Sequence, residues 1–149
     1  TSACQAFTVY AYAFILRDSE IAMDEDFSLA MQLMNRGKKL LKRARDYGMR
    51  SFEVSYPGFN ESYNMDPSLA LRKINEDDLA TLYWTAAAWG LYVSVSKDNP
   101  SVIIELPNIG HLLDSSLRDL ERILYFEAYV GSDPGDTEFK QNELLNEDQ

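Results

Sequence analysis

The chain has 149 residues, 46% of them hydrophobic, and it carries 14 Lys and Arg against 24 Asp and Glu, a formal net charge of −10. This length and composition fit a single globular domain over residues 1–149 and exclude a disordered chain. The acidic balance argues against nucleic acid as a partner, and no run of about 20 apolar residues is present to span a bilayer.

The first predicted helix covers residues 3–17 and is apolar on every side, which predicts burial of most of its surface. Tyr10 and Phe14 share one of its faces. The opening residues 1–4 look like a bacterial lipoprotein cleavage site, but the apolar segment that follows favours Cys4 as a buried helical residue. A single cysteine also excludes a disulfide within the chain.

A long second helix is predicted to begin at the acidic residues 24–26, which complement the positive end of a helix dipole, and to end at a turn over residues 56–60. Gly37 and Gly48 interrupt its apolar face, and we interpret them as points where another helix packs closely. The opposite face is basic and is either solvated or a docking strip for an acidic partner protein. Its cations are Arg36, Lys38, Lys39, Lys42, Arg43, Arg45 and Arg50.

Turn signals divide the rest of the chain into shorter helices. Asp66 followed by Pro67 predicts a short helix that ends near residue 73. Asn75 is the expected cap of a helix running to about residue 96, and Asn99 caps the next one, which Pro107 kinks or restarts. Further helices are expected over residues 118–130 and 137–145, with a break at residues 131–135.

The segment YWTAAAWG, residues 83–90, is the most informative motif. Its alanines allow another helix to come close, whereas Trp84 and Trp89 are large and each carries one N–H that needs a partner. The two indoles point about 140° apart, so one can pack in the core while the other lines a groove. Tyr92 shares a face with Trp89. These aromatics and Tyr83 either belong to the core or wall a pocket for an apolar small molecule.

Every predicted element has helical period, and no segment alternates convincingly as a strand does. Helices joined by turns of a few residues form antiparallel hairpins. We therefore expect an all-α fold, which is either a tetratricopeptide-like helical repeat or an irregular bundle.

The sequence offers no affirmative case for an enzyme, and it indicates no catalytic residue, metal site or cofactor. One cysteine and one histidine cannot form a typical zinc cluster. A nucleophilic pair would have to join Cys4 and His111, which both lie among apolar residues. Asp77 and Asp78 are better explained as acids at a helix start, and no phosphate-binding glycine loop is present.

The segment LYWTAAAWGLYVSVSKDNP, residues 82–100, closely resembles the signature of the T component of tripartite ATP-independent periplasmic (TRAP) transporters, a bacterial lipoprotein family. Three further matches follow the family order: AFTVYAYAFI at residues 6–15, RARDYGMRSFEVSYPGF at residues 43–59, and the step Leu106-Pro107. The resemblance covers roughly residues 3–117, whereas residues 118–149 fit it poorly.

The resemblance implies tetratricopeptide-like hairpins in a periplasmic protein that is lipid-anchored in its precursor. It also implies pairing with the transporter's periplasmic substrate-binding protein, a trimeric assembly with an apolar pore or cleft, and transfer of an apolar ligand to that partner. In the family, the segment matching residues 6–15 lies well inside the precursor. Cys4 is therefore not expected to be the lipid anchor, the chain is expected to lack its true beginning, and its last repeat is either reduced or incomplete.

We therefore expect a non-enzymatic periplasmic accessory of a TRAP-type transporter. The rival interpretation is a helical-repeat adaptor that binds a protein segment and no small molecule, and a small-molecule-modifying enzyme ranks third. An apolar cavity beside Trp89 would favour ligand handling, whereas a solid core there would favour the adaptor. The expected ligand residues are Tyr10, Phe14, Tyr83, Trp84, Trp89 and Tyr92, and the expected partner residues are Arg43, Arg45, Lys97 and Asn99.

Overall fold

The computed structural model describes residues 2–130, and every element within that range is a helix. This confirms the predicted all-α fold. The chain separates into two compact units, Thr1–Ser116 and Leu117–Gln149. The first unit holds all elements up to the start of the last helix, and the described part of the second unit is helical. The break and the helix predicted over residues 131–145 lie outside the described residues.

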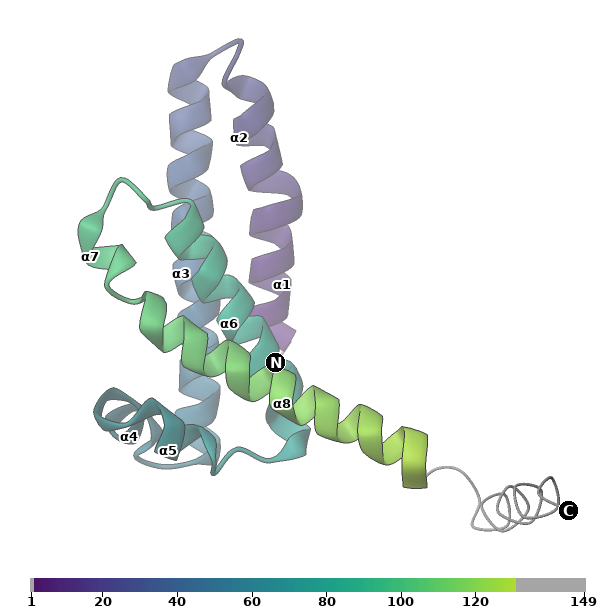
Figure 1. Cartoon of the computed structure of the whole chain (residues 1–149). Coiled ribbons are helices and arrows are strands. Elements are labelled where there is room, and N and C mark those ends of the chain that lie inside the picture. Colours follow the sequence, from purple (N-terminus) through teal and green to yellow (C-terminus); the bar gives the residue numbers. More distant parts are fainter. Residues whose placement is uncertain (1, 131–149) are drawn as a thin grey trace, which may run out of the picture. The chain divides into compact units, whose positions relative to one another are not determined.

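The N-terminal half of the first unit is an antiparallel helical hairpin (Figure 1). Its first arm consists of α1 (Ser2–Tyr10), the π-helix η1 (Ala11–Leu16) and α2 (Arg17–Ala22), which follow one another directly. Its second arm is α3 (Phe27–Ser55), which begins where the Asp26 carboxylate accepts the Leu29 N–H at 2.9 Å. The predicted start of the long helix at its acidic residues is therefore confirmed, and the first arm runs further than the predicted residue 17.

The remaining helices are short, apart from two. They are α4 (Phe59–Met65), α5 (Pro67–Leu71), the 3-10 helix η2 (Glu76–Asp78), α6 (Leu79–Ser94), α7 (Pro100–Ile103) and α8 (Leu106–Val130). The helix starts predicted at Asp66 and Asn99 are confirmed, since Asp66 accepts the Leu69 N–H at 3.0 Å and Asn99 accepts the Ser101 N–H at 3.1 Å. The predicted cap at Asn75 is not confirmed, because its side chain makes no capping hydrogen bond and α6 begins only after η2. The helical pattern around Pro107 does restart, because α8 begins one residue before that proline.

Helix α4 was not predicted, because the sequence around it contains only a turn signal. Gly58 adopts a left-handed conformation with φ of 83°, which reverses the chain after α3. The Glu53 carboxylate then accepts the N–H groups of Gly58 and Asn60, both at 2.8 Å. These bonds satisfy free donors at the new helix start, so a helix forms where the sequence shows only a break.

The main core lies where α6 packs against α3 and is closed by α4, α5, α7 and the first turns of α8, whereas α1 packs against α3 and α6 in a separate, smaller cluster. Trp84 and Trp89 belong to different clusters, which confirms that the two indoles point in different directions. Tyr63 closes one end by donating its hydroxyl to the Asn108 carbonyl at 2.6 Å. The main cluster comprises Phe52, Phe59, Tyr63, Ala70, Leu71, Leu82, Ala86, Trp89, Val93, Val102, Ile109 and Leu112.

Small residues set the spacing of the helices, as predicted. A Cβ placed on Gly37 would lie 2.6 Å from Leu16 Cδ2, and one placed on Gly48 would overlap the Thr85 side chain. One turn before Gly48, Ala44 meets Ala88 in a cluster that also contains Cys4. These contacts require glycine at positions 37 and 48 and alanine at positions 44 and 88, because any larger side chain would push the helices apart.

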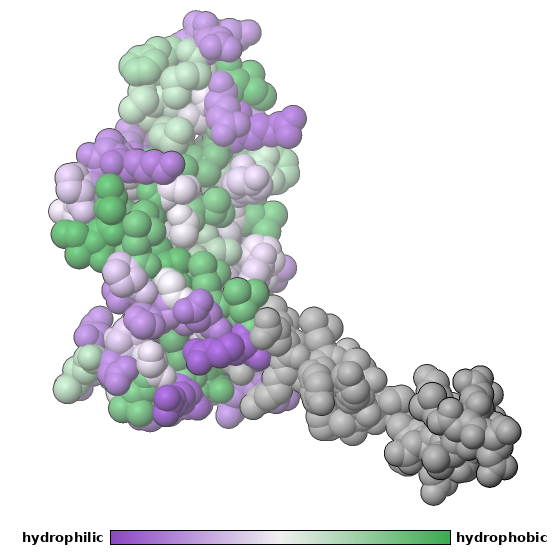
Figure 2. Space-filling model, viewed as in Figure 1, coloured by the Kyte–Doolittle hydropathy of each residue, from purple (hydrophilic) through white to green (hydrophobic). Residues whose placement is uncertain are grey.

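The first arm is less buried than its sequence predicts. One stripe of it is inside, but Tyr10 is 41% exposed, Tyr12 62% and Phe14 57%. Within the described residues α3 and α6 cover one side of this arm, so the prediction of burial on most sides is wrong. Apolar residues are spread over the visible surface of the molecule (Figure 2). The buried stripe consists of Cys4, Thr8, Ala11, Ile15, Leu16, Ser19 and Ala22.

Candidate functional site

A groove lies between the first arm and the end of α6. Its volume is about 390 Å³, which falls within the range of small-molecule sites. Its apolar floor belongs to one packed cluster that includes Leu16, Met34, Leu91 and Val95. The lining residues are Tyr12, Ala13, Leu16, Arg17, Glu20, Met34, Leu91, Ser94 and Val95.

The π-helix η1 forms one wall of this groove. Tyr12, Ala13 and Leu16 come from it, and Arg17 and Glu20 follow on α2. A π-helix is wider than an α-helix and rotates the residues that follow it, and such segments are frequent at functional sites. Arg17 and Glu20 add charged groups to a lining that is otherwise mostly apolar. The groove can therefore hold a largely apolar molecule with one polar end.

The predicted ligand aromatics do not line this groove. Tyr10 and Phe14 are exposed on the first arm with their ring centroids 5.7 Å apart, and the Tyr10 hydroxyl accepts a bond from Arg36 Nη2 at 3.3 Å. Tyr83 and Trp84 meet edge to face at 5.3 Å, with Trp84 packed on the small-residue cluster. The structure thus brings these residues together in pairs rather than in one site.

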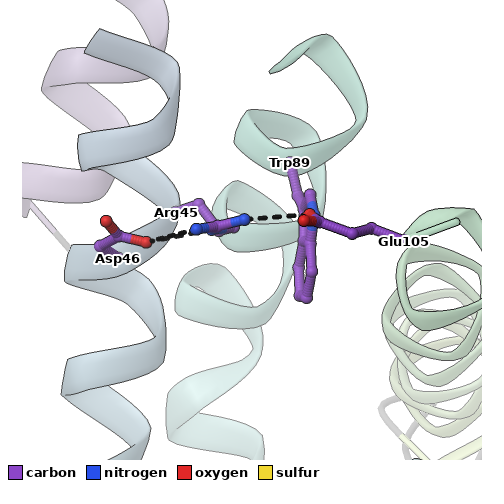
Figure 3. A network of polar contacts seen from close by, with 4 residues as sticks. All are labelled: Arg45, Asp46, Trp89 and Glu105. Atoms are coloured by element: carbon purple, nitrogen blue, oxygen red, sulfur yellow. Dashed lines mark hydrogen bonds and ion pairs between the residues drawn. The ribbon is translucent and has the colours of Figure 1, made fainter. Parts of the chain in front are cut away.

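Trp89 forms a junction with Arg45 and Glu105 (Figure 3). The indole is 7% exposed and its Nε1 donates to Glu105 Oε2 at 2.6 Å. The Arg45 guanidinium carbon lies 5.0 Å from the Trp89 ring centroid and 5.9 Å from that of Tyr92. Trp89 is therefore surrounded by core and polar partners, as expected for a group that holds the fold together.

Arg45 is fully engaged within the chain. Its Nη1 donates to Glu105 Oε2 at 3.0 Å, and its Nη2 donates to Asp46 Oδ1 at 2.8 Å. The Arg45 side chain is 15% exposed, so these bonds to charged groups are worth more than an exposed pair. The junction joins α3, α6 and the segment between α7 and α8.

The other predicted partner residues lie on the surface. Arg43 is exposed, with its guanidinium carbon 5.9 Å from the Phe7 ring centroid. Lys97 and Asn99 are exposed in the turn between α6 and α7, where Asn99 also caps α7. These three side chains are accessible to a partner, whereas Arg45 is held by its neighbours.

The two residues considered for nucleophilic chemistry do not meet. Cys4 Sγ lies 4.0 Å from Thr85 Oγ1, whereas His111 Nδ1 lies 3.5 Å from Ser68 Oγ. Burial raises the pKa of the Cys4 thiol above its ordinary value, which disfavours the reactive thiolate. Among the described residues, no cluster of histidine, cysteine or acidic side chains could hold a metal ion.

Sequence reasoning missed the groove because its walls come from three separate stretches of the chain, the first arm, α3 and the end of α6. The pair Leu91 and Val95 does lie one helical turn apart, and Met34 falls on the predicted apolar face of α3. Neither signal distinguishes groove from core. Within residues 2–130, no helix has the length and apolar character required to cross a membrane.

Comparison with curated proteins gives short matches to the DNA-directed RNA polymerase subunit beta' of Acinetobacter baumannii (strain ATCC 17978) and of Koribacter versatilis (strain Ellin345). Each is 58% identical, over 41 and 40 residues respectively. The matches cover 28% and 27% of this chain, and the chain spans 3% of the length of either subunit. Such a segment shows local similarity and assigns no function to the chain.

No solved structure matches the chain. A family model described as TRAP transporter T-component matches residues 1–128, which confirms the resemblance seen in the sequence and extends it beyond residue 117. Because that match spans most of the 149 residues, this chain belongs to the TRAP transporter T-component family.

Proposed function

We propose that this protein is a periplasmic accessory of a TRAP-type transporter that holds an apolar small ligand and passes it to the substrate-binding protein. Family membership makes the chain a TRAP transporter component. The observation that carries the ligand proposal is the groove of about 390 Å³ with its π-helical wall. Its floor of aliphatic side chains favours an apolar ligand, because burial of apolar surface drives binding there.

As the place where a ligand binds, we rank the six predicted aromatics below the groove. Tyr10 precedes the groove residue Tyr12, and Phe14 lies between the groove residues Ala13 and Leu16, so both aromatics border the groove along the first arm. Trp89 is a core residue whose indole N–H is already bonded. We therefore place the ligand against Tyr12, Leu16 and Leu91.

The ligand proposal is tested with a neutral apolar fluorescent probe, N-phenyl-1-naphthylamine. Ala13→Trp places an indole at the groove wall, whereas Ala6→Trp places one on the same arm away from the groove residues, and both alanines are exposed. We expect Ala13→Trp to weaken probe binding by about tenfold, a loss of about 1.4 kcal/mol. Equal binding by wild type and both variants would contradict the groove as the site.

The adaptor remains the second candidate, and the packing around Trp89 favours it. The Trp89 indole is packed against Tyr63, Arg45 and Glu105. A ligand bound beside Trp89 would instead need a cavity there. Whether the protein is a ligand carrier or an adaptor, we propose that the basic face of α3 (residues 36–50) binds the protein partner. If the protein co-purified with the substrate-binding protein without any ligand in the groove, the adaptor would be supported. If co-purification required a ligand, the carrier would be supported.

From family membership we also propose that the protein is periplasmic and forms a homotrimer. Light scattering on the purified chain measures its mass in solution against the monomer mass of 17.0 kDa. A monomeric mass at all protein concentrations would contradict the trimer.

A further inference from the structure

A second, smaller pocket lies between α3 and the turn that follows α6. Its volume is about 180 Å³. It is distinct from the apolar groove, since the two share no lining residue. Its walls carry three ammonium groups, and they comprise Lys38, Lys39, Lys42, Tyr92, Ser96, Asp98 and Asn99.

The charges around this pocket are not balanced. Lys38 Nζ pairs with Asp98 Oδ1 at 3.0 Å, and the end of α6 adds a partial negative charge of about −0.5. Lys39 and Lys42 form no ion pair with a carboxylate of the described residues. More than one positive charge is therefore uncompensated, in a chain whose net charge is −10. Like charges three and four residues apart on a helix repel one another, so an anion here would relieve that repulsion.

Ser96 supplies an independent observation. This residue is 3% exposed, and its Oγ is the buried side-chain polar atom that has no hydrogen-bond partner among the described residues. A buried hydroxyl without a partner costs free energy, so a native structure seldom leaves one unless something binds it. Ser96 lines the same pocket as the three lysines.

We propose that this pocket binds a small free oxyanion, a phosphate or a carboxylate group, with Lys39 and Lys42 supplying charge and Ser96 donating a hydrogen bond. Lysine suits this role because its ammonium group acts as a mobile point charge with three donors. Asp98 competes with the anion for Lys38. A pocket of about 180 Å³ accommodates a group of a few heavy atoms.

The proposal is tested by titrating the intact chain with inorganic phosphate and with succinate at constant ionic strength, followed by calorimetry. We expect saturable binding of at least one anion. The double substitution Lys39→Gln with Lys42→Gln should weaken it by about tenfold or more, and Ser96→Ala by a few-fold. Asp98→Asn should strengthen it, because it removes the competing carboxylate. Lys73→Gln, which removes the same charge outside the pocket, should leave it unchanged.

Stability measurements separate a binding role from a structural one. Ser96→Ala removes an unpartnered hydroxyl, so it should leave the unfolding free energy of the anion-free protein unchanged or raise it. Three results would overturn the proposal: no saturable binding of either anion, equal loss of binding in Lys73→Gln and the double variant, or binding of a hexaglutamate peptide at least tenfold tighter than succinate. The last result would assign the pocket to an acidic protein segment.

Discussion

Gly48 of α3 lies directly against Thr85 of α6, so that a Cβ on Gly48 would overlap the threonine hydroxyl and come within 2.8 Å of its Cβ. Thr85 cannot move away freely, because its hydroxyl donates to the Thr81 carbonyl at 2.6 Å and it is fully buried. Cys4 of α1 contacts the same threonine. Helices α1, α3 and α6 therefore meet at one point, and their spacing depends on Gly48 having no side chain.

The first prediction is that Gly48→Ala destabilises the protein. Overpacking of a tight helix crossing costs about 1–3 kcal/mol against a gain of about 1 kcal/mol in helix propensity, so we expect a net loss of up to about 2 kcal/mol in unfolding free energy. Chemical denaturation followed by circular dichroism measures the change in unfolding free energy.

Gly110→Ala is the matched control, because a Cβ there would meet nothing within 4 Å. This helical substitution should stabilise the protein by up to about 1 kcal/mol. If both variants gave the same change, the close contact between α3 and α6 would be incorrect.

The glycine contacts and helix caps could be predicted from the sequence, because their signals are local. Asp66 before proline and Asn99 before proline each specify a helix start within a few residues. Gly37 and Gly48 fall on an otherwise apolar helical face, so close packing is the simplest reason for them. In each case the structure shows the contact that local chemistry requires.

The candidate site could not be predicted in the same way. Arg45 and Glu105 are 60 residues apart, and no period in the sequence relates them. The exposure of Tyr10 and Phe14 depends on which helices cover the first arm, which is a property of the whole packing. The unpartnered hydroxyl of Ser96 likewise becomes visible only when every neighbour is placed.

The second prediction concerns the junction around Glu105. Glu105→Gln keeps the side-chain shape but removes the charge that pairs with Arg45 and the strong acceptor for the Trp89 N–H. Because Glu105 is one-third exposed, we expect a discounted loss of about 1–2 kcal/mol in unfolding free energy. Tryptophan fluorescence in a denaturant titration measures it and also reports the altered surroundings of the indole.

Asp46→Asn provides the comparison, since it removes the other carboxylate bonded to Arg45. The Asp46 side chain is 56% exposed, and surface pairs of this kind contribute at most about 1 kcal/mol. A larger loss from Asp46→Asn than from Glu105→Gln would show that Glu105 does not carry the junction.

The third prediction is a pH dependence that originates at Glu53. The N–H groups of Asn60 and Gly58 hold the pKa of this carboxyl below its ordinary value of 4.5. A group with a lowered folded-state pKa stabilises the fold at pH above its unfolded value, and the contribution is lost as pH falls through the folded value. The wild type should therefore lose more stability on acidification through this range than Glu53→Gln does.

Unfolding free energies measured at neutral pH and at several points below pH 4.5 test this difference. Glu25→Gln, in the exposed turn before α3, controls for the loss of one negative charge. Parallel pH profiles for the wild type and Glu53→Gln would mean that the carboxylate does not cap the start of α4.

The fourth prediction separates two arginines that the sequence places on the same basic strip. Arg43 is exposed and rests on the Phe7 ring, a contact worth about 0.5–1 kcal/mol at an exposed site. Arg43→Glu should therefore leave the fold nearly intact while weakening capture of the substrate-binding protein that we propose as the partner. Arg45→Glu should instead destabilise the fold, because it places a carboxylate beside Glu105 and Asp46.

Denaturation and co-purification on both variants measure the two effects, and Lys73→Glu controls for charge reversal elsewhere. If Arg43→Glu retained full capture while Arg45→Glu lost capture without losing stability, the partner would contact the junction, and the assignment of Arg45 to the fold would have to be abandoned.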